Sequence, residues 1–296
     1  MNIMVTGGVG FVGTNLIKRL LLDGHKVVCL DNYSTGKKEN EVDHKNVTYV
    51  DVDVSDNSKR HKAFGLVRYG LEKPDIIYHM AALARIQPSL NNPVPSIQNN
   101  FDSTLNILEW SRNNDIPVVF AGSSSYHHGL WGSPYAWSKH AGEQLCKLYS
   151  KVYKLPTAIC RFYNVYGPHQ IESGAYATVL GIFEKQYREG KLLTVTGDGR
   201  QKRDFTHIED IVDGIIRCGD NIEKVSGEIF ELGTGKNYSI IEITEFFNQT
   251  EVEYIPARDG EYDVTLADYS KANDILEWNP TKNLKEYIEN VIDDKS

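Results

Sequence analysis

"NIMVTGGVGFVGTNL", residues 2–16, joins a short apolar segment to a glycine-rich turn and the start of a helix. Residues 13–25 carry apolar side chains at helical spacing, directly after the turn that contains Gly7, Gly10 and Gly13. Glycine permits a tight turn and lets a pyrophosphate approach the backbone, where the first N–H groups of the helix attract phosphate. The stretch therefore predicts a dinucleotide-binding strand–turn–helix, with the spacing GxxGxxG in place of GxGxxG.

Expected strands and helices alternate along the first half of the chain. Strands are expected at residues 26–32, 47–54, 75–82, 118–125 and 157–165, with helical stretches between most of them. This order predicts an α/β fold, a Rossmann-type doubly wound parallel sheet with helices on both faces. The elements then become shorter, so we expect a Rossmann domain at 1–165 and a smaller α/β substrate domain at 166–296. The helix and strand within 204–234 are expected to return to the first domain.

Composition excludes several classes of function. The net charge of -8 argues against a nucleic-acid surface, and no apolar run approaches membrane-spanning length. The N-terminus enters a strand at once, so we expect no signal peptide and a cytoplasmic protein. The four cysteines lie far apart without metal-ligand spacing, which predicts reduced, buried thiols and no metal site.

Asp31 ends the second expected strand. A carboxylate there can accept hydrogen bonds from the adenosine ribose and would repel a 2′-phosphate, which favours NAD over NADP. Lys37 and Lys38 follow closely and weaken that exclusion. Taken alone, Asp31 fits a turn or capping aspartate in "DNYSTG" equally well.

"GSPYAWSKHAGEQLCKLYS", residues 132–150, predicts a helix with Ser133 as its cap and Pro134 in its first turn. Tyr135 and Lys139 then share one face, one helical turn apart. By itself this spacing is more typical of a packing tyrosine beside a solvated lysine, and only the other motifs of the chain favour a catalytic pair.

Together these segments resemble the extended short-chain dehydrogenase/reductases of the nucleotide-sugar epimerase/dehydratase group. The matching motifs are Thr6–Gly13, Asp31 with Asn32, Asp53 with Val54, His79–Ala82, the helix from Asn100, Tyr135 with Lys139, Arg161–Pro168, Gly197–Phe205, and Arg258 with Gly260 and Glu261.

The resemblance implies NAD as cofactor. The residues implied to contact it are Gly7, Gly10, Phe11, Val12, Asp31, Asn32, Ser34, Thr35, Gly36, Asp53, Val54, Met80, Ala81, Ala82, Ala84, Asn100, Tyr135, Lys139 and Phe162. Tyr135 is implied to be the catalytic acid and base, and we expect the Lys139 ammonium to lower its pKa and to bind the nicotinamide ribose. Ser123 best matches the family's catalytic hydroxyl, with Ser124 second.

A nucleoside diphosphate sugar is the implied substrate. Arg203 and Arg258 match the arginines that bind the two phosphates, Asn164 matches a phosphate ligand, and Glu261 matches a contact of the nucleotide ribose. Thr178, Val179, Thr194 and Thr196 resemble, less securely, positions that line the base pocket. Thr265 falls at a gatekeeper position beside the C2 substituent of the sugar, where its small size is expected to admit an N-acetyl group.

One segment departs from the family. The loop "YHHGLWGS", residues 126–133, is shorter than in relatives, which is expected to alter a wall of the sugar pocket. Ser124 and Ser125 stand where dehydratases and decarboxylases carry acidic residues, so simple epimerisation is favoured. His127 and His128 are not expected to bind a metal, because no other ligands cluster with them.

The resemblance thus predicts an NAD-dependent epimerase, acting at C4 of a UDP-hexose or UDP-N-acetylhexosamine through a 4-keto sugar. A 4-keto reductase, a UDP-uronic acid epimerase and a non-catalytic nucleotide sensor or scaffold remain as alternatives. The helices from Asn100 and Pro134 carry apolar stripes and resemble those of the family's dimer interface, so we expect a homodimer. The alternative is that both stripes face only the chain's own sheet.

Overall fold

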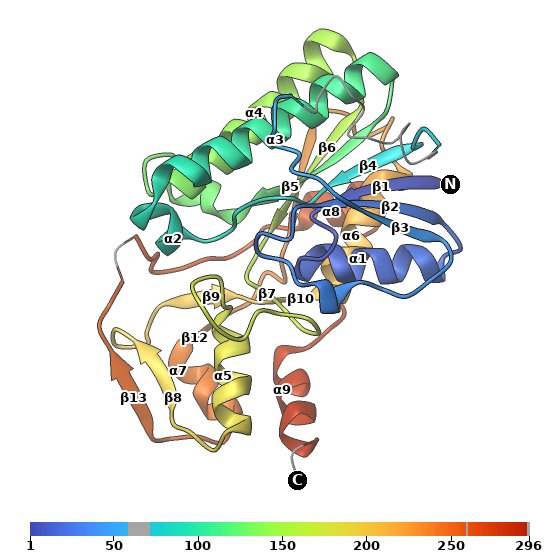
Figure 1. The fold of residues 1–296 in the computed structure, drawn as a ribbon. Helices are drawn as coiled ribbons and strands as arrows, with labels where there is room; N and C mark the ends of the chain where they lie inside the picture. The colour runs from blue at the N-terminus through green and yellow to red at the C-terminus, as the bar shows by residue number, and fades with distance from the viewer. Residues whose placement is uncertain (59–71, 259, 295–296) are drawn as a thin grey trace.

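The computed structural model describes residues 1–58, 72–258 and 260–294 (Figure 1). Its strands are β1 (Asn2–Thr6), β2 (Lys26–Asp31), β3 (Val47–Asp51), β4 (Ile76–His79), β5 (Val118–Ser123), β6 (Thr157–Phe162), β7 (Val165–Tyr166), β8 (Leu193–Thr196), β9 (Lys202–Asp204), β10 (Thr206–His207), β11 (Glu228–Leu232), β12 (Asn237–Ser239) and β13 (Val252–Ile255). Its helices are α1 (Phe11–Leu22), η1 (Lys38–Asn40), α2 (Ile86–Asn91), α3 (Pro93–Asn114), η3 (Ser124–His128), α4 (Pro134–Tyr153), α5 (Val179–Arg188), α6 (Ile208–Asp220), α7 (Ile240–Phe246), α8 (Ser270–Leu276) and α9 (Leu284–Asp293).

A seven-stranded sheet forms the centre of the molecule, in the order β11-β6-β5-β4-β1-β2-β3. Each neighbouring pair of its strands runs parallel, which confirms the doubly wound sheet expected from the sequence. The chain proceeds from β1 to β2 and β3 on one side, and β4 then returns to the other side of β1. The carboxyl ends of β1 and β4 therefore flank the switch point of the sheet, where ligands of such folds bind.

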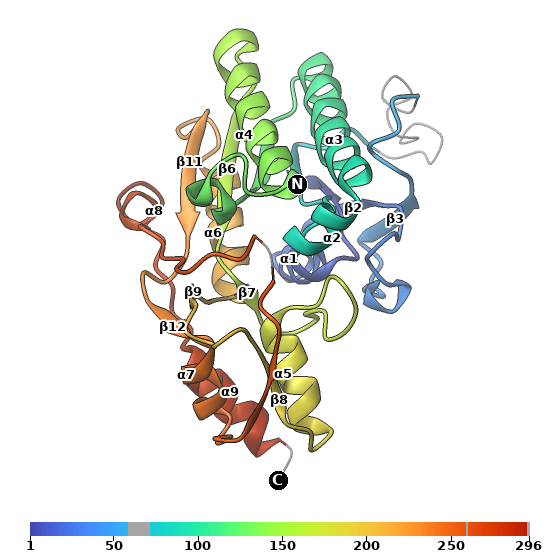
Figure 2. The same cartoon turned by 90° about the vertical axis from the view of Figure 1, so that its left-hand side faces the viewer.

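Helices cover both faces of this sheet because successive strand residues point to opposite sides. Ile3 and Val5 of β1 are buried with residues of α1 and α6, whereas Met4 between them packs among residues of α3 and α4. Figure 1 shows α3 and α4 on one face and α1 and α6 on the other, and Figure 2 shows α3 beside α4. A rigid two-sided core thus fixes the strand ends that face the switch point.

Helix α4 begins as its sequence predicts. The Ser133 hydroxyl accepts a hydrogen bond from the Ala136 N–H at 3.1 Å, and Pro134 occupies the first turn, where its missing N–H costs nothing. This start directs the side chain of Tyr135 toward the carboxyl end of β5, where both Tyr135 and Ser123 line one cavity.

Helices α5, α7 and α9 and strand β8 form a smaller unit below the sheet in Figure 1, with its own apolar core. Strand β11 pairs with β6 at the edge of the large sheet, and α6 packs against β6. The proposed boundary near residue 165 stays a prediction. Within the described part of the chain, no helix combines the length and apolar character needed to cross a membrane.

Candidate active site

A cavity of about 710 Å³ lies between the large sheet and the smaller unit. Its walls include most of the site residues predicted from the sequence: Gly7, Gly10, Phe11, Val12, Asp31, Asn32, Ser34, Thr35, Gly36, Asp53, Val54, Met80, Ala81, Ala82, Ala84, Ser123, Ser124, Tyr135, Phe162, Asn164, Thr178, Val179, Thr194, Thr196, Arg203, Arg258, Glu261 and Thr265. Asn100 and Lys139 do not line it. Segments far apart in the sequence therefore meet at the switch point.

The glycine turn after β1 fits a pyrophosphate. Gly7 has φ of +70°, and a Cβ there would lie 2.7 Å from the backbone of Ala81. A Cβ on Gly13 would lie 2.1 Å from the Gly7 carbonyl oxygen. Gly10 precedes α1, and no side chain caps that helix, so its first N–H groups stay available to an anion. Only glycine lets the turn close this tightly, and the cradle it forms suits NAD.

Asp31 lies at the cavity wall at the end of β2. Its carboxylate accepts hydrogen bonds from the Val9 N–H at 3.1 Å and the Tyr33 N–H at 2.8 Å. Burial raises the pKa of Asp31, and these backbone donors oppose that shift. A carboxylate has about four acceptor positions, and the Asn32 N–H also donates to Asp31, so about one position remains for a ribose hydroxyl. Lys37 lines the same cavity, which leaves one cation near the expected adenosine end.

Replacing Asp31 with alanine should weaken NAD binding by about 1–3 kcal/mol, because a ribose hydroxyl loses its acceptor and the Val9 N–H loses a partner. Calorimetric titration with NAD and NADP measures the effect. Asp51→Ala is the matched control, since Asp51 is the exposed partner of Asp31 in the strand register and does not line the cavity. Unchanged NAD affinity in Asp31→Ala, or wild-type preference for NADP, would contradict the assignment.

Tyr135 and Ser123 meet at the end of β5. The Tyr135 phenol is hydrogen-bonded to the Ser123 hydroxyl, which also accepts from the Ser125 N–H at 3.2 Å and from the Ser125 hydroxyl at 2.9 Å. Burial raises the pKa of Tyr135, while the Ser123 bond and the positive charge of Arg85 oppose the shift. Of the two candidate serines, the geometry brings Ser123 to the phenol and leaves Ser124 on the cavity wall.

Lys139 is buried beside Phe120 and Glu143. Its ammonium lies 4.6 Å from the centre of the Phe120 ring, and it interacts with the Glu143 carboxylate. Burial lowers the pKa of Lys139 to about 8. Arg85 is the cation whose charge opposes the rise in the pKa of Tyr135. The expected effect of Lys139 on the pKa of Tyr135 and its expected bond to the nicotinamide ribose stay predictions.

Asn100 also lies behind the wall. Its side-chain oxygen accepts from the Leu83 N–H at 2.7 Å, and its amide group donates to the Leu83 carbonyl at 3.2 Å and to the Ser138 hydroxyl at 3.0 Å. These bonds satisfy the buried amide within the protein. Leu83 lines the cavity, so Asn100 supports the site indirectly by fixing the backbone of the segment after β4.

Polar side chains of the smaller unit line the other end of the cavity. Arg203 lies 3.9 Å from the Glu261 carboxylate, and Arg258 lies on the same wall. Asn164 donates hydrogen bonds to the Thr265 hydroxyl and the Asp204 carbonyl, each at 3.0 Å. This end thus presents two guanidinium groups, a pair that suits a diphosphate, whereas both N–H groups of the Asn164 amide are used within the protein.

Residues expected at the base pocket bond mainly to their own unit. Thr178 caps α5 by accepting from the Gly181 N–H at 2.9 Å, and its hydroxyl donates to the Gln170 side chain at 2.9 Å. Thr194 accepts a hydrogen bond from the Gln186 amide at 2.9 Å. Thr178 thus fixes the start of α5, and the bond between Gln186 and Thr194 joins α5 to β8.

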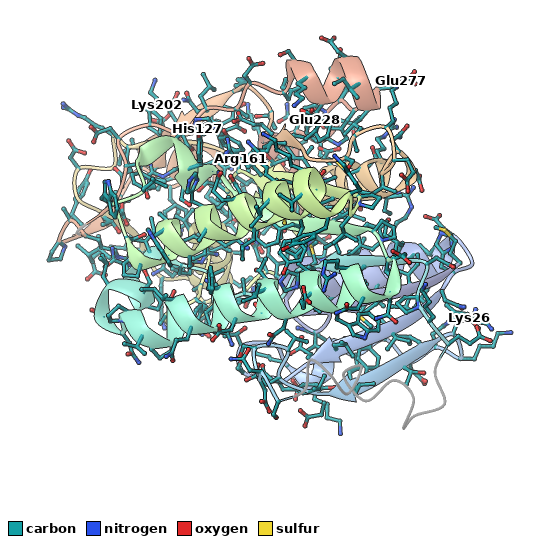
Figure 3. All side chains as sticks on the ribbon, turned by 90° about the horizontal axis from the view of Figure 1, so that it is seen from above. Lys26, His127, Arg161, Lys202, Glu228 and Glu277 are labelled. Atoms are coloured by element: carbon teal, nitrogen blue, oxygen red, sulfur yellow. The ribbon has the colours of Figure 1, made fainter. Side chains whose placement is uncertain are left out.

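A charged network supports the short loop before α4. The buried Arg161 guanidinium donates to Glu143 at 3.0 and 2.7 Å and lies 3.6 Å from the centre of the Tyr126 ring. His127 is hydrogen-bonded to Glu231, and Figure 3 shows His127 and Arg161 close together beside α4. Burial alone would raise the pKa of Glu231, but hydrogen bonds from His127 and Tyr163 lower it to about 2. The loop is therefore fastened to the sheet despite its shortness.

Several residues that line the cavity were not predicted from the sequence, among them Arg85, Tyr176 and Tyr262. Arg85 lies three residues after the matched His79–Ala82 motif, and this proximity in the sequence could have indicated that it belongs to the site. Nothing in the local pattern of Tyr176 or Tyr262 distinguishes them from ordinary loop residues.

The doubly wound sheet, the glycine turn and the Ser123–Tyr135 pair define an enzyme of the extended short-chain dehydrogenase/reductase class. The model of the NAD dependent epimerase/dehydratase family matches residues 3–233, and the chain belongs to that family. NAD is accordingly its cofactor.

Two relatives and one solved structure indicate the range of this similarity. The chain is 31% identical to a UDP-glucose 4-epimerase of Mycolicibacterium smegmatis, over 99% of this chain and 98% of that one. It is 32% identical to a UDP-N-acetyl-alpha-D-glucosaminuronate decarboxylase of Bacillus cytotoxicus, over 83% and 79% of the two chains. A UDP-glucose 4-epimerase of Thermotoga maritima, solved with UDP-glucose, superimposes with a TM-score of 0.89 at 28% identity, covering 99% and 98%.

Proposed function

We propose that the chain is an epimerase that inverts C4 of a UDP-hexose or UDP-N-acetylhexosamine through a 4-keto sugar. The observation that carries this proposal is the single cavity that joins the glycine turn, the Ser123–Tyr135 pair and the paired arginines of the smaller unit. The similarity to two UDP-glucose 4-epimerases along nearly the whole chain supports it.

Bound NAD supplies a reversible hydride acceptor at the sugar carbon. Tyr135 removes the proton from the 4-hydroxyl and later returns it, and Ser123 holds the same oxygen by a hydrogen bond. Arg203 and Arg258 hold the diphosphate while the keto sugar turns about its bond to the phosphate and presents its other face. Because Tyr135 both takes up and returns one proton, the chain needs no further acid or base for this inversion.

Decarboxylation or dehydration is less well supported. Both reactions call for further acidic or basic groups at the sugar, and Ser124 and Ser125 follow Ser123 where such relatives carry acidic residues. Ser125 is already bonded to Ser123. A uronic acid epimerase, a 4-keto reductase and a nucleotide-sensing protein are the remaining alternatives.

Incubation with a panel of UDP-, dTDP- and GDP-sugars, followed by NMR of the products, tests the proposal. The expected product is the C4 epimer, formed without net consumption of cofactor. Stoichiometric oxidation of added NADH would identify a reductase, and loss of carbon dioxide would identify a decarboxylase. Binding of nucleotide sugars with no conversion at all would favour the sensor.

Thr265 is proposed to leave room for an N-acetyl group at C2. It is buried, and its hydroxyl accepts hydrogen bonds from the Asp204 N–H at 3.1 Å and from Asn164 at 3.0 Å. Its small volume, more than its hydroxyl, is therefore what it offers to the sugar. A tyrosine there would fill the space that an acetamido group needs.

Thr265→Tyr should lower kcat/KM for UDP-N-acetylglucosamine relative to UDP-glucose, since forced overpacking costs about 1–3 kcal/mol. Thr265→Val keeps the volume while removing the hydroxyl and is the matched control. The ratio of the two kcat/KM values in each variant is the measurement. An equal decrease in kcat/KM for both sugars in Thr265→Tyr would show that Thr265 does not determine access of the N-acetyl group. A wild type that never accepts the N-acetyl sugar would show the same.

We also propose a homodimer formed through α3 and α4. The outer face of α4 exposes Leu148, Val152 and Tyr153, with side chains that are 48%, 56% and 49% exposed. Apolar side chains at helical spacing on an outer face favour pairing with another such helix. Light scattering at micromolar concentration should give twice the chain mass, and Leu148→Asp should shift the mass toward that of one chain. A wild type with the mass of a single chain would overturn this proposal.

A further inference from the structure

Arg85 occupies an unusual position in the cavity. It directly precedes α2, and its backbone has φ of +129° and ψ of 142°. Residues other than glycine rarely adopt this conformation. Its half-buried side chain lines the cavity together with Tyr135 and Ser123. A strained non-glycine residue in a site indicates a side chain that is useful there.

Within the part of the chain that the structure describes, one hydrogen bond holds the guanidinium of Arg85 and no carboxylate pairs with it. Its Nε donates to the Tyr176 carbonyl at 3.1 Å, which fixes the side chain across the cavity. Among residues 1–58, 72–258 and 260–294, no carboxylate forms an ion pair with it. Arg203, in contrast, has Glu261 at 3.9 Å. With Nε occupied, the two terminal nitrogens of Arg85 still present a pair of donors that matches the two oxygens of a carboxylate.

The location of Arg85 separates it from the diphosphate site. Its positive charge acts on Tyr135, which lies at the carboxyl end of β5. Burial lowers the pKa of the Arg85 guanidinium, and its interaction with the Tyr135 phenol opposes that shift. Arg203 and Arg258 come from the smaller unit at the other end of the proposed substrate path. If those two residues hold the diphosphate, the charge of Arg85 falls beside the sugar ring.

We propose that Arg85 is a specificity-determining residue that binds a carboxylate on the sugar, so that the site prefers acidic nucleotide sugars over neutral ones. This inference rests on the proposed epimerase chemistry, and at the sugar it favours the uronic acid alternative over the neutral hexoses. A partly desolvated cation without a partner disfavours a neutral ligand, because the bound sugar removes water from the guanidinium and returns no charge. A carboxylate restores both the charge and the two hydrogen bonds.

The test compares the binding of UDP-glucuronate, UDP-glucose and UDP by calorimetry, with NAD present, in wild type, Arg85→Gln and Arg85→Lys. The wild type should bind UDP-glucuronate about 10- to 100-fold more tightly than UDP-glucose, the range expected for hydrogen bonds between charged groups. Arg85→Gln should abolish this preference and leave UDP binding unchanged. Arg85→Lys should retain part of it. Arg85→Gly removes the charge without the backbone strain and replaces Arg85→Gln if that variant folds poorly.

Turnover separates this role from an effect on Tyr135. In the specificity role, Arg85→Gln lowers kcat/KM for the acidic sugar by a larger factor than for the neutral sugar, so the ratio of the two kcat/KM values falls. An equal decrease in kcat/KM for both sugars, with the pH profile of kcat shifted to higher pH, would show that Arg85 acts on the ionisation of Tyr135. That result would overturn the inference. A wild type without preference for the acidic sugar would overturn it as well. If no sugar is converted at all, the epimerase proposal fails, whereas the binding comparison still decides the role of Arg85.

Discussion

Tyr135→Phe is expected to lower turnover by about 10²–10⁴-fold, because it removes the group that transfers the proton of the sugar hydroxyl. The aromatic ring remains, so the cavity keeps its shape and NAD should bind as in the wild type. Single-turnover kinetics with the substrate identified by the sugar panel, together with calorimetric NAD titration, measure both effects.

Tyr163→Phe provides the matched control. Tyr163 is also buried, but its hydroxyl donates to Glu231 at 2.8 Å and it does not line the cavity. The control should therefore keep nearly full turnover. Near-normal turnover in Tyr135→Phe would remove Tyr135 from its proposed role, and equal losses in both variants would indicate a general loss of structure.

The pH dependence provides a second check on Tyr135. Because burial raises its pKa, the phenolate that accepts a proton becomes more populated as pH increases. The kcat/KM of the wild type should accordingly increase with pH on the alkaline side of neutrality. Tyr135→Phe should lose this increase.

Arg161→Met is expected to lower the free energy of unfolding by about 3–5 kcal/mol, because it leaves a buried carboxylate without its partner. The Arg161 and Glu143 side chains are only 6% and 1% exposed, and they share two hydrogen bonds. Glu143 lies on α4 and Arg161 on β6, so the pair fastens the helix that carries Tyr135 to the sheet. Urea denaturation of both proteins measures the loss.

The double variant Glu143→Leu with Arg161→Met distinguishes a stranded charge from a general packing defect. Replacement of both charges removes the desolvation cost of the Arg161–Glu143 pair but leaves Lys139 without the Glu143 carboxylate, so the double variant should recover part of the lost stability. A double variant as unstable as the sum of the two single variants would show that packing of the side chains, and not the unpaired charge, is responsible.

The sequence alone was enough to predict the nucleotide-binding half of the fold. The strand, turn and helix of residues 2–16 depend on glycine conformations and on apolar periodicity, which are local properties of the chain. The parallel sheet followed from the alternation of strands and helices, and the start of α4 followed from Ser133 and Pro134. Each of these features is specified within a few neighbouring residues.

Only the tertiary structure decided which side chains reach the cavity. It brought Ser123, and not Ser124, to the Tyr135 phenol, and it buried Lys139 and Asn100 behind the wall. The sequence could not distinguish these outcomes, because a strand end or a helix face admits several directions until long-range packing selects one. The same holds for Arg85, whose charge acts on Tyr135 only because β4 and β5 are neighbours in the sheet. Electrostatic interactions depend on distances in space, and the fold sets those distances between residues far apart in sequence.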